Sequence, residues 1–341
     1  ENPLTQQEFK AITIHQDRIE KVQIIPTKNM VISASADGTL RLTDIENRIA
    51  KKQFNGHRSG VWDFALWGNN NYAISASFDH SLRIWDLNSG GQTAKLEGHD
   101  DEVYSVKVTK DHRQAVSCSA DTTIRIWDLV NYSEIKTLWG NEDDSKSIVL
   151  TNDGQSILSG CWDHRVRLWD VTTGQLKKVY KGHKGPVHQI LLFNNDRVVA
   201  SASSDESVKF WDIESGEELQ TLSGHQGQVF TLTSDPSQNV IVSSSEDMTL
   251  KVWSIKNAQL LQTLEGHTNL IQHVAIAPNG QYIVSLSKDH TLRVWDIQTG
   301  ECAFVSTLSS PPRCCDISRD SRKLVVGDEL GRLHVYLLQT I

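Results

Sequence analysis

Histidine, serine and aspartate, the three side chains of a nucleophilic triad, recur together along this chain of 341 residues. In such a triad the imidazole takes a proton from the serine hydroxyl, and the carboxylate holds the imidazole in the required tautomer. Successive members of each series are 42 residues, or a multiple of 42 residues, apart. The series are His15, His57, His99, His183, His225 and His267; Ser33, Ser75, Ser117, Ser159, Ser201, Ser243 and Ser285; and Asp37, Asp79, Asp121, Asp163, Asp205, Asp247 and Asp289.

The repetition favours a structural role over a catalytic one. An active site is usually a single departure from a repeating pattern, whereas this trio returns in repeat after repeat. A buried imidazole can donate to a carboxylate and accept from a hydroxyl, and that hydroxyl can accept from an indole N–H. Tryptophans keep the same interval at Trp85, Trp127, Trp169, Trp211, Trp253 and Trp295. We therefore expect hydrogen-bonded sets without catalysis, and no metal site, because successive histidines belong to different repeats.

Short β-strands are the elements that must position these side chains. Residues 98–128 contain three stretches, VYSVKV, QAVSCS and TTIRIWD, which polar turn residues separate. Apolar and polar residues alternate in the first and third stretches, and neither is long enough for an ordinary helix. A Gly-His pair opens this unit and a Trp-Asp pair closes it.

These marks, at a period of about 40–45 residues, resemble the WD-repeat β-propeller family, in particular its tandem arrays from bacteria. The resemblance covers nearly the whole chain, and it implies that histidine, aspartate, serine and tryptophan form a tetrad in each blade. A second serine often lies two residues before the aspartate, which leaves open which serine takes part. The implied tetrads are His57, Asp79, Ser75 and Trp85; His99, Asp121, Ser117 and Trp127; His183, Asp205, Ser201 and Trp211; His225, Asp247, Ser243 and Trp253; and His267, Asp289, Ser285 and Trp295.

Eight three-strand sets can be counted, and 8 × 42 is 336 of the 341 residues. We therefore predict an all-β fold, an eight-bladed β-propeller of four-stranded antiparallel blades, as one domain over residues 1–341. The segment TQQEFKAI, residues 5–12, is predicted to be a strand that completes the C-terminal blade and so closes the propeller. In that last set the period places Ser309 in the histidine position, Gly331 in the aspartate position and Leu337 in the tryptophan position.

The fourth set departs from the rule, because Asn141 stands where the other sets have histidine, inside the acidic run 141–144. This predicts either a decayed tetrad or, less favoured, a specialised loop. A cation at one strand position in seven sets could suggest a phosphate site, but an ion pair within the sheet is the simpler interpretation. These cations are Arg41, Arg83, Arg125, Arg167, Lys209, Lys251 and Arg293.

Composition limits the partners. The net charge is −8 and the isoelectric point is near 5.9, so neither nucleic acid nor an acidic membrane surface is expected. No apolar run approaches ~18 residues, and no signal peptide is visible. The five cysteines are odd in number and form no CxxC pair, which favours free thiols in a reducing compartment and a cytoplasmic protein. No cofactor is expected.

The resemblance further implies that partners bind at the narrow, top end of the propeller. Two classes of residue vary from blade to blade there, one near the start of each first strand and one directly before each aspartate. Trp62, Phe78, Tyr104 and Trp162 fall in adjacent blades and could form one aromatic patch, although the rings could instead pack on neighbouring loops. The candidate partner-binding residues are Trp62, Phe78, Tyr104, Trp162, Lys146, His188, Phe230, Glu246 and Lys288.

These observations predict a non-enzymatic scaffold that binds a protein or peptide through the aromatic top face. Because the sequence lacks a starting Met, it is expected to be the sensor or interaction domain of a larger signalling or defence protein. The alternative from another class is an enzyme or a small-ligand site in the central channel. A nucleic-acid-binding role is a third and weaker possibility. The sequence does not identify the partner or the oligomeric state.

Overall fold

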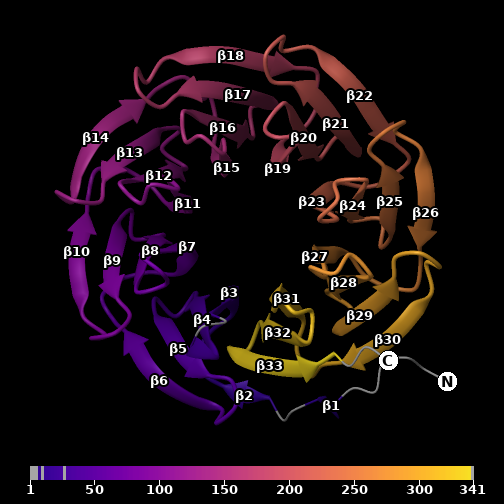
Figure 1. Cartoon of the computed structure of the whole chain (residues 1–341), viewed down its shortest axis with the longest axis horizontal. Coiled ribbons are helices and arrows are strands. Elements are labelled where there is room, and N and C mark those ends of the chain that lie inside the picture. The colour runs from indigo at the N-terminus through magenta and orange to yellow at the C-terminus, as the bar shows by residue number, and fades with distance from the viewer. Residues whose placement is uncertain (1–6, 9–10, 26–27, 339–341) are drawn as a thin grey trace. The chain divides into compact units, whose positions relative to one another are not determined.

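All regular elements in the computed structural model are β-strands, over the described residues 7–8, 11–25 and 28–338 (Figure 1). The strands form eight antiparallel sheets. The chain divides into two compact units, residues 54–221 and residues 1–53 with 222–341, and the boundaries fall inside the strands β6 and β22. Among the described residues, no helix is long and apolar enough to cross a membrane.

The unit of residues 54–221 contains four four-stranded sheets in which the strands follow one another in chain order. The first is β7 Val61–Trp67, β8 Tyr72–Ser77, β9 Leu82–Asp86 and β10 Gln92–Leu96; the second is β11 Val103–Val108, β12 Gln114–Ser119, β13 Ile124–Asp128 and β14 Ser133–Leu138. The third is β15 Ser145–Leu150, β16 Ser156–Cys161, β17 Arg165–Asp170 and β18 Leu176–Lys181; the fourth is β19 Val187–Phe193, β20 Val198–Ser203, β21 Ser207–Asp212 and β22 Glu218–Ser223.

The other unit contains three sheets of the same order and a fourth that joins the two ends of the chain. The three are β3 Ile19–Ile25, β4 Met30–Ser35, β5 Leu40–Asp44 and β6 Ile49–Phe54; β23 Val229–Ser234, β24 Val240–Ser245, β25 Leu250–Ser254 and β26 Leu260–Leu264; and β27 Ile271–Ile276, β28 Tyr282–Ser287, β29 Thr291–Asp296 and β30 Cys302–Thr307. The fourth is β31 Pro312–Ile317, β32 Lys323–Asp328 and β33 Arg332–Leu337, with β1 Gln7–Glu8 and β2 Ile12–Thr13.

Burial explains the sequence pattern of each sheet. The middle strands β12 and β13 are buried almost throughout, whereas the outer strand β14 is mostly exposed. Within each unit, the apolar side chains of neighbouring sheets pack against one another; one such cluster joins Ile74 and Ile84 of one sheet to Val106 and Trp127 of the next. The core is therefore distributed between sheets, as expected for a repeat protein.

The N-terminal segment completes the C-terminal sheet, as the sequence predicts. Both β1 and β2 pair antiparallel with β33, and they lie beside it in Figure 1. The registers are Gln7 opposite Leu337 and Ile12 opposite Leu333. Residues 5, 6, 9 and 10 of the predicted strand lie outside the described residues.

The predicted positions in the last repeat are wrong by one residue. Leu324 pairs with Tyr336, just as Ala115 pairs with Trp127, so Tyr336 and not Leu337 takes the tryptophan position. By the same register Leu308 replaces Ser309 in the histidine position, and Leu330 replaces Gly331 in the aspartate position. The physical reason is that the connection from β30 to β31 is one residue shorter than its counterparts.

Candidate functional site

The predicted tetrad residues are joined by a continuous hydrogen-bond chain, seen clearly in the sheet of β11–β14. His99 Nδ1 lies 2.7 Å from Asp121 Oδ2, and His99 Nε2 lies 2.7 Å from Ser117 Oγ. Trp127 Nε1 donates to the same Ser117 Oγ at 2.8 Å. Ser117 is fully buried and Trp127 is 1% exposed. The serine four residues before the aspartate is therefore the one that meets both rings.

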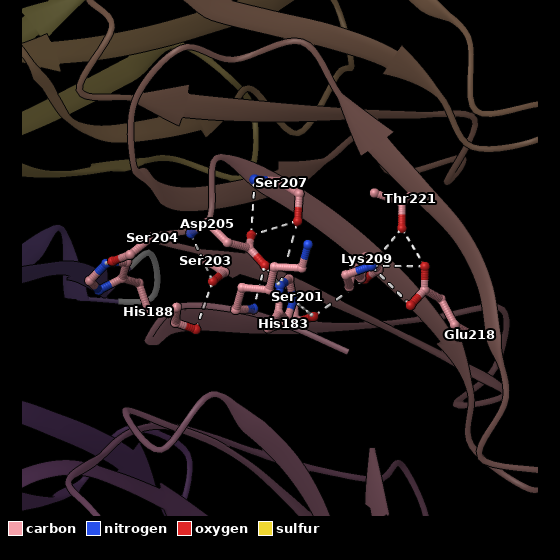
Figure 2. A network of polar contacts seen from close by, with 12 residues as sticks. His183, His188, Ser201, Ser203, Ser204, Asp205, Ser207, Lys209, Glu218 and Thr221 are labelled. Atoms are coloured by element: carbon pink, nitrogen blue, oxygen red, sulfur yellow. Dashed lines mark hydrogen bonds and ion pairs between the residues drawn. The ribbon is translucent and has the colours of Figure 1, made fainter. Parts of the chain in front are cut away.

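The other four predicted tetrads have the same connections. Their histidine–aspartate distances are 2.7–2.9 Å, their histidine–serine distances 2.7–2.8 Å and their tryptophan–serine distances 2.8–2.9 Å. Figure 2 shows the set of the β19–β22 sheet, with His183, Ser201 and Asp205 together and Lys209 beside Glu218. His15, Ser33 and Asp37 form a partial set, since Thr43 is in the tryptophan position.

The second serine has a different task. Ser119 Oγ donates to the Asp101 carbonyl at 3.1 Å and accepts from the Asp121 N–H at 3.1 Å. Equivalent bonds are made by Ser77, Ser203, Ser245 and Ser287 in their sheets. This serine therefore holds the loop that enters the sheet against the turn that carries the aspartate.

In the sheet of β11–β14 the environment of the tetrad keeps His99 neutral and Asp121 ionised. Burial lowers the pKa of His99, and the hydrogen bond and charge of Asp121 only partly oppose this effect. For Asp121, burial alone would raise the pKa. The hydrogen bonds from His99 and Thr123 outweigh this effect and hold the pKa of Asp121 well below its ordinary range. A neutral imidazole with its proton on Nδ1 satisfies Asp121 and Ser117 at once. A buried, fully bonded hydroxyl is arranged for stability and not for attack on a substrate.

We expect acid to destabilise the protein in two stages. The pKa values of His15, His57, His99 and His267 lie below 6.5 in the folded chain, so the unfolded chain takes up their protons first. Stability is therefore complete above about pH 6.5 and falls as the pH drops further. The tetrad aspartates, whose pKa values are also lowered, add a second loss below about pH 4.

Urea unfolding at pH 7, 5 and 3.5, each at low and high salt, measures this dependence. The buried pairs are weakly screened, so the loss between pH 7 and 5 should persist at high salt. A free energy of unfolding that is unchanged between pH 7 and 5 would contradict the prediction.

The fourth repeat has a rebuilt network rather than a decayed one. Arg167, which is 1% exposed, reaches across to Asp163 with Nη1 at 3.0 Å and Nη2 at 2.5 Å, and its Nη1 also lies 3.2 Å from Asn141 Oδ1. Trp169 still donates to Ser159, at 3.1 Å. At the same strand position of the preceding sheet, Arg125 pairs instead with Glu134 of the outer strand at 2.5 Å. Four of the repeating cations, Arg83, Arg125, Arg167 and Lys209, thus form ion pairs within their sheets, whereas Lys251 contacts Thr263 and Arg293 contacts Cys302.

A β-bulge positions the first class of candidate binding residues. In each sheet the register of the first two strands shifts by one residue, between Val103 and Ser105 for example, so that Tyr104 is the extra residue. Trp62, Lys146, His188 and Phe230 are the extra residues of their own sheets. Bulges re-aim side chains next to functional sites. In the last sheet the equivalent residue is Arg313.

Backbone hydrogen bonds bring the second class beside the first. The Phe78 N–H donates to the Gly60 carbonyl at 2.9 Å, and the Trp162 N–H donates to the Asp144 carbonyl at 2.9 Å. Each acceptor lies two residues before the extra residue of its bulge. The turn that carries Phe78 or Trp162 is therefore held beside that bulge.

Three aromatic rings meet in the unit of residues 54–221. Trp62 and Phe78 are stacked with ring centroids 4.8 Å apart. Tyr104 contacts both rings edge-on, at 6.4 Å from Trp62 and 5.8 Å from Phe78. Tyr104 is buried at 7% exposure, whereas Trp62 and Phe78 are partly exposed. The three rings therefore pack against one another, and two of them keep part of their surface accessible to solvent.

Lys146 extends this group to the next aromatic ring. Its Nζ lies 3.7 Å from the centroid of Tyr104 and 4.3 Å from that of Trp162. Trp162 in turn contacts the His188 ring at 6.3 Å, and His188 Nε2 lies 2.7 Å from Ser204 Oγ. We call this group of partly exposed and buried side chains the aromatic surface; it consists of Trp62, Phe78, Tyr104, Lys146, Trp162 and His188.

The remaining candidates, Phe230, Glu246 and Lys288, lie in the other unit. Lys288 Nζ is 3.5 Å from Glu329, and Arg313 is within 4.0 Å of Glu329 and 2.5 Å of Glu20. Sequence reasoning missed Arg313 and Glu329, because the shortened last repeat hides their positions from the 42-residue period. Within the described residues, no group of three or more His, Cys, Asp or Glu side chains could hold a metal ion.

The comparisons with known proteins agree with this geometry. The family model described as "WD domain, G-beta repeat" matches residues 6–44, 49–86, 90–128, 132–170, 174–212, 216–254 and 258–296. The crystal structure of the computationally designed Ika8 protein is similar, with a TM-score of 0.87 and 28% sequence identity over 97% of this chain and 99% of that one. The comparison with curated proteins gives no match. Seven sheets have four strands, and in the eighth the place of the fourth strand is shared by β1 and β2, which both pair with β33. The predicted fold class, an eight-bladed β-propeller, is therefore confirmed.

Proposed function

Because the chain belongs to the WD40 repeat family, whose propellers are generally protein-interaction scaffolds, we propose that it binds a protein or peptide segment through the aromatic surface. The observation that carries the proposal is the contiguous group of Trp62, Phe78, Tyr104 and Trp162, bridged by Lys146. Aromatic anchors surrounded by polar groups are the usual composition of a binding hot spot. The scaffold is non-enzymatic, since its repeated histidine, serine and aspartate side chains are engaged in the tetrads.

The wider setting of this scaffold is also part of the proposal. It serves as the sensor or interaction domain of a larger signalling or defence protein, and its partner is neither nucleic acid nor membrane. A cytoplasmic location is supported by the five free cysteines. Burial raises the pKa of Cys118 and of Cys314 to about 12, which keeps both thiols protonated and unreactive.

Loss of the indoles of Trp62 and Trp162 is expected to weaken partner binding strongly. A hot-spot residue contributes about 2 kcal/mol or more, so the double variant Trp62→Ala/Trp162→Ala should bind a partner captured by the wild-type chain at least ~30-fold more weakly. Affinity is measured by titration of the purified partner, after circular dichroism shows that the variant is folded.

Trp139 supplies the matched control. It is 67% exposed and lies outside the aromatic surface, on the connection after β14. Trp139→Ala should leave affinity unchanged. A partner that binds the double variant as tightly as it binds the wild type would exclude the aromatic surface.

A further inference from the structure

The aromatic surface is bordered by two acidic loops of the same unit. These loops lead into β11 and β15, whose extra bulge residues are Tyr104 and Lys146. Their carboxylates are Asp100, Asp101, Glu102, Glu142, Asp143 and Asp144. Three of these six carboxylates lie near a basic side chain. Arg165 is 2.7 Å from Glu142, His80 is 4.0 Å from Asp101, and Lys146 is 3.8 Å from Asp144. The border therefore carries a surplus of negative charge.

Two of these carboxylates share a single donor at the centre of the surface. The Tyr104 hydroxyl lies 3.1 Å from Glu102 Oε2 and 3.1 Å from Asp144 Oδ2. A phenol has one proton, so it can donate fully to only one of the two at a time. Burial and both carboxylates raise the pKa of Tyr104, which keeps that proton in place. The pair can accept further hydrogen bonds from a cationic donor.

A site that binds a cation between two aromatic rings already exists beside this pair of carboxylates. The Lys146 ammonium sits between the faces of Tyr104 and Trp162, at 3.7 and 4.3 Å from the ring centroids, distances typical of cation–π contacts. Its side chain is 24% exposed. Burial lowers the pKa of Lys146 more than Asp144 and Glu102 raise it, so desolvation of the ammonium is incompletely compensated. A lysine held in this way can be released to solvent by a better occupant.

We propose that the partner is a basic peptide segment, and that one of its arginine side chains takes the place between Tyr104 and Trp162 that Lys146 holds in the free protein. The planar guanidinium stacks on aromatic faces and binds carboxylates with two parallel hydrogen bonds, so arginine fits this site better than lysine. Glu102 and Asp144 are its counter-ions. The inference rests on the proposed function and specifies the chemistry of its partner.

Three labelled probes test the inference with the full chain. They are glycine–serine peptides of equal length that carry four arginines, four lysines or four glutamates, and binding is followed by fluorescence anisotropy. We expect the arginine probe to bind most tightly and the glutamate probe not to bind. The Glu102→Gln/Asp144→Asn variant should bind the arginine probe at least tenfold more weakly.

The sharpest expectation is a gain of affinity. Lys146→Met removes the competing ammonium from between the rings and leaves a flexible, uncharged side chain, so it should strengthen binding of the arginine probe at least threefold. Lys110→Met is the control with the same change of net charge. Lys110 lies on the loop that follows β11, at the far end of that strand from Tyr104, and its Nζ contacts Asn152. Equal gains in the two variants would show a long-range charge effect and overturn the inference. In the wild type, chemical labelling of Lys146 should increase when the arginine probe is bound; unchanged labelling would also overturn it.

The outcomes separate this inference from the proposed function. If the glutamate probe binds and the arginine probe does not, and Trp62→Ala/Trp162→Ala abolishes that binding, the aromatic surface is the binding site but its partner is not basic. If the arginine probe binds equally well to the wild type and to that double variant, both proposals fail.

Discussion

Replacing Arg167 by alanine is expected to lower the free energy of unfolding by about 3–5 kcal/mol, the usual cost of removing one partner from a buried ion pair. The guanidinium makes two contacts with Asp163 and one with Asn141. Burial raises the pKa of Asp163, and the hydrogen bonds of Arg167 are the largest influence that lowers it again. Without them the carboxylate has no histidine to replace the lost partner. Urea unfolding followed by far-ultraviolet circular dichroism measures the loss.

Arg125→Ala is the matched control for this variant. Arg125 occupies the same strand position one sheet earlier, but it pairs with Glu134, whose side chain is 30% exposed, while His99 serves Asp121. Exposed pairs contribute little, so a loss of about 1 kcal/mol is expected. Adding Asn141→His to the Arg167→Ala variant should recover part of the stability, because the imidazole can then bond Asp163 and Ser159. Equal losses in the two single variants would show that the Arg167–Asp163 pair contributes no more to the free energy of unfolding than the partly exposed Arg125–Glu134 pair.

The contrast between Arg125 and Arg167 shows what a repeat can and cannot reveal before the structure is known. The 42-residue period predicts the strands, their order and the partners of each tetrad, because every repeat places the same residue in the same local backbone. It also identifies Asn141 as a departure. It does not show that Arg167 reaches Asp163, since both arginines occupy the same position in the period. Two residues distinguish their surroundings: Asn141 replaces the histidine, and Leu176 stands where the preceding sheet has Glu134.

The aromatic surface was predictable in composition but not in its contacts. The variable positions Trp62, Phe78, Tyr104 and Trp162 stand out in the sequence. The insertion of Lys146 between two rings, however, depends on side chains from neighbouring sheets meeting in space. The bulge that holds Tyr104 and Lys146 is also invisible to the period, because the extra residue recurs in every repeat and leaves the interval unchanged.

Gly331 is the position at which the period misleads and the structure predicts a large effect. Its φ of +73° is a left-handed conformation that disfavours residues with a Cβ atom. Its carbonyl accepts hydrogen bonds from the N–H groups of Ile14 and His15, both at 3.0 Å. A Cβ at residue 331 would lie against the His15 carbonyl oxygen, 2.7 Å from the His15 carbonyl carbon and 2.8 Å from the Asp17 carbonyl oxygen. These are backbone atoms and cannot rotate away.

We therefore expect Gly331→Ala to lower the free energy of unfolding by about 2–5 kcal/mol, the sum of the left-handed cost and the steric cost. Gly154→Ala isolates the first cost, because Gly154 has a φ of +70° and its added Cβ would meet only Thr109 Cγ2, at 3.9 Å. That variant should lose about 1–2 kcal/mol. The clash in Gly331→Ala pushes the N-terminal segment away from β33, so limited proteolysis should cut before Ile19 faster in this variant than in Gly154→Ala. Equal stabilities and equal cleavage rates in the two variants would contradict the prediction. They would mean that the N-terminal segment can move away from Gly331 without loss of stability, so that its hydrogen bonds do not hold the last sheet together.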